Sequence, residues 1–143
     1  MDDRQALYDL MVRYTYAVDS GEDIDDFLSV FTEDAVLQGA LWQPKSGLGE
    51  LEKWARTTLE MRKTVRMRHY LSNISITATA DTASMHSYLT CVYRSPVMEG
   101  VDARTVLFGE YLFEARRVAG SWLLNRRVVR LDVTDAGTRR DVH

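Results

Sequence analysis

The sequence predicts an α+β domain in which three N-terminal helices lie against a strongly curved, mainly antiparallel sheet. Two observations carry this prediction. Apolar residues recur at helical spacing as far as Thr64, and from Val65 onward the spacing changes to the period of two that strands impose. Helices first and strands afterwards indicate that the two kinds of element form separate layers.

The first helix is expected over residues 2–19. Asp2 or Asp3 can cap its start, and Gly21 supplies its stop. Its apolar residues recur at helical spacing and are Leu7, Leu10, Met11, Tyr14 and Val18.

Two shorter helices and a short strand complete the first half of the chain. A helix is expected over 24–31, where Asp23 can cap it, and a turn with a short strand over 32–39. After a loop that contains a proline and two glycines, the third helix is expected over 50–64.

Four long strand candidates follow, separated by short breaks. They cover 65–80, 82–95, 103–118 and 121–134. Strands this long must coil or bend, so the sheet and the helices are expected to enclose a cavity. Both faces of the sheet carry apolar residues. We therefore expect one face to contact the helices and the other to meet a second copy of the chain in a two-fold homodimer.

Composition and charge narrow the class of protein. The 143 residues predict one domain over 1–134, followed by a polar tail over 135–143. The net charge of −3 gives no basic footprint for nucleic acid. No apolar run approaches the roughly 18 residues of a membrane span, and no export signal is visible. A cytoplasmic protein without nucleic-acid or membrane partners is expected.

Cys91, the single cysteine, excludes an internal disulfide. It lies in an apolar, strand-like run, where cysteine usually fills a small space in the core. The sequence shows no metal-ligand spacing and no phosphate-binding loop, so we expect neither a metal nor a cofactor.

His69 is the unusual residue of its strand. Val65, Met67, His69 and Leu71 alternate along one face, so the ring points to the apolar side. Such a histidine is either a hydrogen-bonded core residue or a base. Asp19 lies in the last turn of the first helix, where the helix dipole disfavours a carboxylate. If Asp19 fixes one ring nitrogen, the other nitrogen can take a proton from a substrate.

Three strings of the sequence resemble one protein family. They are "YTYAVDSGEDIDDFLSVFTEDAV" (14–36), "RHYLSNISI" (68–76) and "YLFEARRVAGSWLLNRRVVRLD" (111–132). Their order and content resemble the SnoaL-like branch of the nuclear transport factor 2-like superfamily, which includes polyketide cyclases and scytalone dehydratase-like enzymes. The resemblance implies a cone-shaped α+β barrel. The fold alone does not imply one activity, because it also hosts isomerases, epoxide hydrolases and non-catalytic subunits.

The resemblance also implies roles for particular residues. In scytalone dehydratase-like and dehydrochlorinase-like members, an aspartate at the end of the first helix pairs with the strand histidine, and the pair abstracts a proton. Asp19 and His69 occupy those positions. Scytalone dehydratase also uses a second histidine, for which His86 is the candidate. Val18 stands where that dehydratase has a tyrosine, which argues against a scytalone-like substrate.

Further residues are candidates for binding the substrate. Asn73 lies four residues beyond His69 and either bonds a substrate oxygen or forms a strand bulge. Arg127 shares a face with apolar residues and either clamps an anionic or carbonyl group or pairs at a subunit interface. Aromatic residues that either line the cavity or fill the core are Tyr14, Tyr16 and Trp42.

The predicted function is a cofactor-independent lyase or isomerase, a dehydratase or cyclase, acting on a hydrophobic oxygenated molecule such as a polyketide or terpenoid intermediate. Two alternatives stay open. An epoxide hydrolase of the limonene-epoxide type needs two carboxylates bridged by an arginine, with Asp19, Arg127 and Asp132 as candidates. A non-catalytic ligand-binding or structural subunit needs no dyad.

Overall fold

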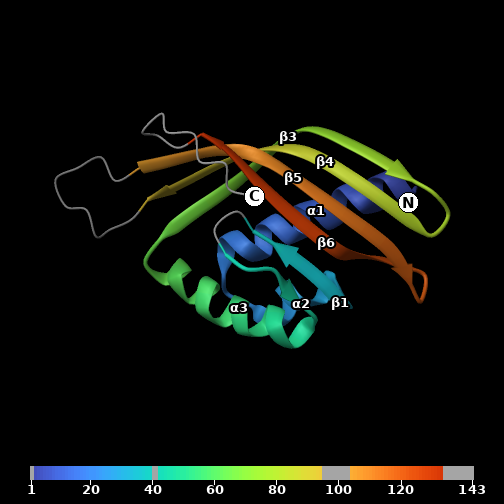
Figure 1. The fold of residues 1–143 in the computed structure, drawn as a ribbon, viewed down its shortest axis with the longest axis horizontal. Helices are drawn as coiled ribbons and strands as arrows, with labels where there is room; N and C mark the ends of the chain where they lie inside the picture. Colours follow the sequence, from blue (N-terminus) through green and yellow to red (C-terminus); the bar gives the residue numbers. More distant parts are fainter. Residues whose placement is uncertain (1, 40–41, 95–103, 134–143) are drawn as a thin grey trace.

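The fold combines three helices with a six-stranded sheet (Figure 1). The structure, a computed structural model, describes residues 2–39, 42–94 and 104–133. The elements in chain order are α1 (Asp3–Ser20), α2 (Ile24–Ser29), β1 (Phe31–Gln38), β2 (Lys45–Ser46), α3 (Leu48–Glu60), a 3₁₀ turn (Met61–Lys63), β3 (Arg66–Ala78), β4 (Thr82–Arg94), β5 (Arg104–Val118) and β6 (Ser121–Val133).

The sheet has the strand order β2-β1-β6-β5-β4-β3. Strands β3 to β6 form the predicted antiparallel meander, and their ends differ from the expected ranges by at most two residues. Strand β1 pairs with β6 in parallel, a partner that the sequence pattern did not reveal. The α+β prediction is confirmed, whereas the strong curvature of the sheet stays a prediction. The expected polar tail over 135–143 lies outside the described residues.

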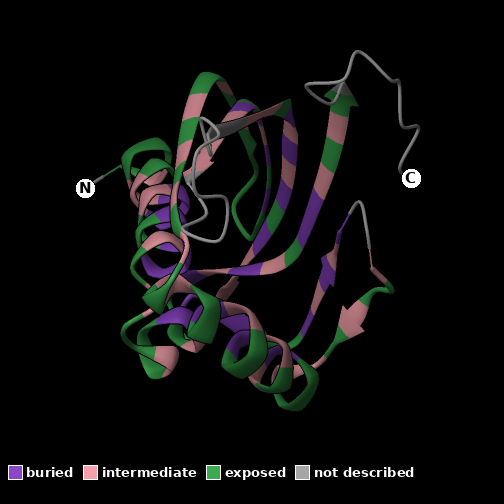
Figure 2. Ribbon diagram, turned by 90° about the vertical axis from the view of Figure 1, so that its left-hand side faces the viewer, coloured by how far each residue is buried: buried purple, intermediate pink, exposed green. Residues whose placement is uncertain are grey.

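Helix α1 begins and ends as its sequence predicts. The Asp2 side chain accepts a hydrogen bond from the Gln5 N–H at 2.7 Å and so caps the helix. Its five predicted apolar residues are all buried. Helix and sheet meet at one cluster of buried residues. Buried positions are purple on the ribbon in Figure 2. Among the described residues, none of the helices combines the length and apolar content needed to cross a bilayer.

A bulge in β3 decides which of its side chains face the helices. Asn73 has a φ of 53°, and the register with β4 shifts at this point. His69 and Leu71 face the core before the bulge, and Ile74 and Ile76 face it afterwards. Asn73 is therefore the bulge residue and its side chain is exposed, which corrects the expectation that it binds substrate.

Asp3 ties the start of α1 to the far end of the sheet. Its carboxylate accepts hydrogen bonds from the Arg117 guanidinium and, at 3.2 Å, from the Trp122 indole N–H. The bond from Arg117 is the main cause that holds the pKa of Asp3 below its ordinary value.

Replacing Asp3 by Asn is therefore expected to destabilise the protein in a pH-dependent way. Because the pKa is lowered, Asp3 binds its proton more tightly in the unfolded chain than in the folded protein. The stabilisation of the fold by the ionised Asp3 is therefore complete above the ordinary aspartate pKa of about 3.9. It is lost as the pH falls through the lower, folded-state pKa. Urea midpoints at pH 7 and 5 should differ between wild type and D3N by the same amount, and the difference should shrink at pH 3. Asp132→Asn, at an exposed position, is the control; an equal D3N deficit at every pH would contradict the account.

Candidate active site

Asp19 and His69 are brought into direct contact by the end of α1 and the edge strand β3. The Nδ1 atom of His69 lies 2.5 Å from Oδ1 of Asp19, and the His69 backbone N–H donates to Oδ2 at 3.0 Å. One carboxylate thus holds both the ring and the backbone of the histidine. Since a carboxylate only accepts, Nδ1 carries a proton, and in the neutral ring Nε2 then presents its lone pair.

The position of Asp19 depends on how α1 ends. Gly21 adopts the left-handed conformation with a φ of 61°, and its N–H donates to the Ala17 carbonyl at 3.1 Å. A Cβ atom at Gly21 would lie 2.6 Å from Cγ of Arg62, whose Nε donates to the Val18 carbonyl at 2.9 Å. Burial lowers the pKa of Arg62, and Asp19 opposes that effect. No periodic pattern marks Arg62, and sequence reasoning missed it.

The His69 ring is enclosed by β4 and β5. Its side chain is 9% exposed and stacks on Tyr111, with ring centroids 6.1 Å apart. Nε2 lies 3.8 Å from the Cys91 thiol. His69 and Cys91 are directly opposite in the β3–β4 ladder, and the His69 N–H points away from β4 to Asp19, so their side chains stand close together.

Cys91 is expected to resist thiol reagents in the folded protein. Burial raises the pKa of its thiol to about 11 from an ordinary 9.0, which lowers the thiolate fraction near neutral pH about 100-fold. Its reaction with Ellman's reagent at pH 8 should be at least 100-fold slower than that of glutathione, and should reach a comparable rate in 8 M urea. Rapid labelling of the folded protein would show that the thiol is neither buried nor protonated.

A second cluster surrounds Arg127, which is 4% exposed and faces the helices from β6. Its Nη1 donates to the Tyr14 hydroxyl at 2.9 Å. Aromatic rings lie around its guanidinium carbon, with centroids 5.3 Å away for Trp42, 5.8 Å for Tyr111 and 5.9 Å for Tyr14 and Trp54. The structure brings Arg127, Tyr14 and Trp42 together, whereas Trp54 and Tyr111 were missed because aromatic residues at core positions give no distinct signal.

Two further predicted site residues lie elsewhere. Tyr16 is 71% exposed, because it projects from the face of α1 opposite the core. His86 lies on the outer face of the sheet, since its neighbours in β4, Met85 and Ser87, face the core. Its Nε2 lies 2.8 Å from Oε2 of Glu110. Neither residue lines a site shared with His69, so both expectations were wrong.

The carboxylate pair expected for an epoxide hydrolase is not assembled around Arg127. Asp132 is exposed, and no carboxylate within the described residues forms an ion pair with the Arg127 guanidinium. The described residues also contain no group of three or more histidine, cysteine or acidic side chains placed to bind a metal ion.

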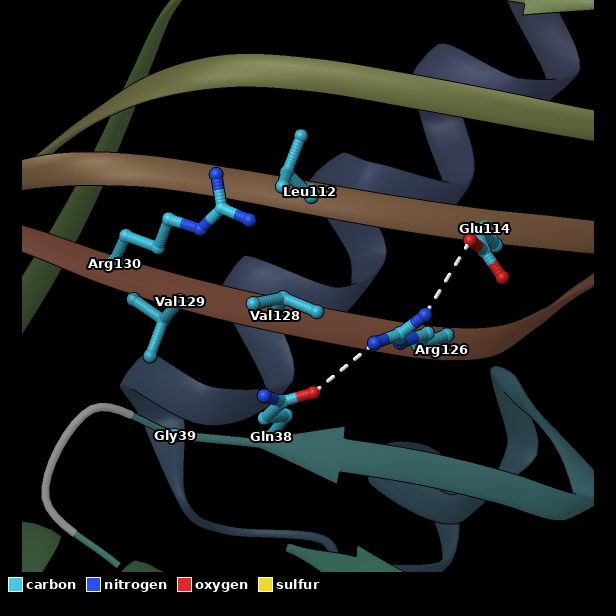
Figure 3. A pocket seen from close by; sticks show the side chains of 8 residues that line it. All are labelled: Gln38, Gly39, Leu112, Glu114, Arg126, Val128, Val129 and Arg130. Carbon is cyan, nitrogen blue, oxygen red and sulfur yellow. Dashed lines mark hydrogen bonds and ion pairs between the residues drawn. The ribbon is translucent and has the colours of Figure 1, made fainter. Parts of the chain in front are cut away.

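A hollow of about 210 Å³ lies on the outer face of the sheet, away from α1 (Figure 3). Leu112 and Val128 form its floor, and Arg126 closes one side through contacts with Glu114 and Gln38. It shares no residue with the Asp19–His69 contact, and nothing in it resembles an acid–base pair. The chemistry therefore places the candidate active site on the inner face, at His69.

Comparison with known proteins settles the family. The family profile described as a SnoaL-like domain matches residues 1–128. The chain belongs to the SnoaL-like family. Its three helices and mostly antiparallel six-stranded sheet are the nuclear transport factor 2-like fold. A search of curated proteins found no significant match for this SnoaL-like chain.

Solved structures similar to this SnoaL-like chain include three from Novosphingobium aromaticivorans. A protein assigned provisionally as an aromatic ring hydroxylase is 32% identical, with a TM-score of 0.77 and coverage of 90% of this chain and 88% of the other. A protein assigned provisionally as a scytalone dehydratase is 24% identical, with a TM-score of 0.80 and coverage of 99% and 91%. An NTF2-like protein with a cystatin-like fold is 21% identical, with a TM-score of 0.76 and coverage of 94% and 86%. The last two likenesses concern the fold alone.

Proposed function

We propose that this protein is a cofactor-independent lyase or isomerase that abstracts a proton next to a carbonyl group of a hydrophobic small molecule. The observation that carries the proposal is the 2.5 Å contact between Asp19 and Nδ1 of His69. It leaves Nε2 as the basic nitrogen inside a largely apolar site.

In the proposed reaction, His69 is the base and Asp19 is its positioning residue. Nε2 takes the proton from the substrate carbon, the C–H electron pair moves into an enolate, and Asp19 stabilises the imidazolium. In a dehydration, the imidazolium returns the proton to the departing β-hydroxyl group, which leaves as water. In an isomerisation, it returns the proton to another carbon atom.

Tyrosine hydroxyls are the proposed donors to the developing enolate oxygen. Burial raises the pKa of Tyr111 well above its ordinary value, so its hydroxyl keeps its proton and can donate. Tyr14 accepts from Arg127, and its hydrogen bond with Tyr111 contributes to the raised pKa of Tyr111, so the two hydroxyls and the guanidinium form one connected group. Tyr111 therefore replaces Asn73 as the expected donor beside His69.

The test is proton exchange in D₂O, which needs no knowledge of the natural product. A panel of hydrophobic β-hydroxy ketones and cyclic ketones, each with and without a carboxylate group, is incubated with the protein, and NMR follows deuterium at the α-carbon and loss of water. We expect exchange above the buffer rate for wild type and not for His69→Ala. Equal exchange by H69A and wild type would sink the proposal.

A second candidate is a non-catalytic subunit of a multi-component oxygenase, favoured by the 32% identity to the provisional aromatic ring hydroxylase. This role requires no acid–base pair. If the protein has this role, neither wild type nor H69A exchanges the α-proton of any panel member above the buffer rate.

We also propose that the outer face of the sheet binds a second copy of the chain. Tyr70, Tyr88 and Phe108 expose 52–55% of their surface on this face. Arg126 lies near Glu114 and Arg130 near Glu110, so a two-fold axis can pair each arginine with a glutamate of the other copy.

Light scattering should give twice the chain mass for wild type. Tyr88→Lys should give a monomer, while Tyr16→Lys should not change the mass; a monomeric wild type would contradict the proposal.

A further inference from the structure

Arg127 is a buried cation whose charge is not matched by its surroundings. Only its Nη1 has a protein partner, the Tyr14 hydroxyl, while its Nε and Nη2 are buried without an acceptor among the described residues. A guanidinium keeps its charge in proteins. Burying an unpaired charge is costly, so the fold holds this side chain in a state that an anion would stabilise.

The two unpartnered nitrogen atoms are not scattered around the guanidinium. The Nε–H and one Nη2–H point in parallel along one edge of the plane, and Nη1 lies on the other side. Two parallel donors fit the two oxygen atoms of a carboxylate. A single carbonyl oxygen or a halide can be shared by both donors only through bent hydrogen bonds.

Aromatic rings hold the guanidinium without neutralising it. The rings of Trp42 and Trp54 lie over it, and both residues are only partly buried. The cluster therefore meets solvent at these two indole rings, the second of which belongs to α3. The aromatic rings around Arg127 also supply apolar surface for the rest of a ligand.

The same cluster borders the proposed base. Tyr111 stacks on His69 and has its ring centroid 5.8 Å from the Arg127 guanidinium carbon. Helix α1 carries Tyr14, which contacts Arg127, and Asp19, which contacts His69, five residues apart and so about 7.5 Å along the helix axis. We infer that the substrate is a carboxylic acid, whose carboxylate binds the Nε–Nη2 edge of Arg127 while a C–H group a few bonds away faces His69. This inference rests on the proposed function and adds the substrate class.

The test uses benzoate as the probe and benzamide, of the same shape but uncharged, as its control. Indole N–H signals in ¹⁵N-labelled wild type report the place of binding, because Trp42 and Trp54 lie over Arg127, whereas Trp122 donates to Asp3. Benzoate should shift the first two signals and leave that of Trp122 unchanged, and benzamide should bind at least tenfold more weakly. Equal binding of the two probes, or a shift of Trp122 alone, would overturn the inference.

Three variants separate this inference from the proposed function. Arg127→Gln should lose benzoate binding at least tenfold and should not lower the melting temperature, because it removes an unpaired buried charge. Arg126→Gln, on the outer face of the same strand, should bind benzoate like wild type. His69→Ala should also bind benzoate normally while losing proton exchange. Undiminished benzoate binding by R127Q would refute the carboxylate site and leave the dyad untouched, while the wild-type indole signals decide the matter if R127Q does not fold.

Discussion

Replacing His69 by Ala is expected to lower kcat/KM by 10² to 10⁴, the range that a positioned general base typically contributes. Among the described residues of the inner face, His69 is the only histidine whose Nδ1 is held by a carboxylate, so that its Nε2 can act as the base. Its side chain is 9% exposed, so the replacement also leaves a small cavity. Circular dichroism and the melting temperature must therefore accompany the turnover measurement.

Asp19→Asn separates orientation from basicity in the same experiment. An amide at position 19 can still accept from the His69 backbone N–H, but its other end no longer stabilises the imidazolium. We expect a smaller loss in kcat than for H69A and little change in KM. Cys91→Ala is the matched control, because the Cys91 thiol contacts Nε2 of His69 but is not the base. This variant should retain activity within about tenfold of wild type. A D19N variant as active as wild type would exclude the dyad mechanism.

Replacing Phe27 by Ala is expected to lower the free energy of unfolding by about 3–5 kcal/mol, the usual cost for a buried phenylalanine. Phe27 is fully buried in α2, and its ring lies 5.1 Å from Phe31, 5.7 Å from Trp54 and 6.3 Å from Tyr14 between centroids. The residue joins α1, β1 and α3, so its loss opens a void shared by three elements. Urea unfolding at fixed protein concentration measures the effect.

Tyr16→Ala is the control for this prediction. It also removes an aromatic ring from a helix, but the ring is 71% exposed. We expect a change within about 0.5 kcal/mol, as for most surface substitutions. If F27A and Y16A were equally stable, the aromatic cluster around Phe27 would not support the fold as described.

The sequence pattern predicted the elements of the fold well because each of them has its own local signal. The cap at Asp2, the stop at Gly21 and the change of period at Val65 are properties of short segments. The parallel pairing of β1 with β6 was not predictable in this way, because it joins segments about 90 residues apart and leaves no mark on either.

The candidate site was predicted in part, for a related reason. Strand parity located His69, and the family resemblance supplied Asp19 as its partner. The alternation of side chains breaks at Asn73, where one extra residue switches the face. The same alternation places His86 on the outer face, because its neighbours Met85 and Ser87 point inward. The expectation that Tyr16 lines the cavity or fills the core was wrong because a helix has two flanks. Only the contacts of the folded protein show which flank is covered.

The contact between Asp19 and the His69 backbone has a consequence for solubility. β3 is the last strand of the sheet, and an edge strand offers its free N–H groups to any other extended chain. The Asp19 carboxylate occupies one of those groups, so it also blocks the edge against further strands. Loss of this aspartate would therefore expose one more N–H group of the edge strand, whatever its effect on activity. An inactive descendant that keeps an acceptor at position 19 would stay monodisperse, and one with Ala there would tend to assemble edge to edge.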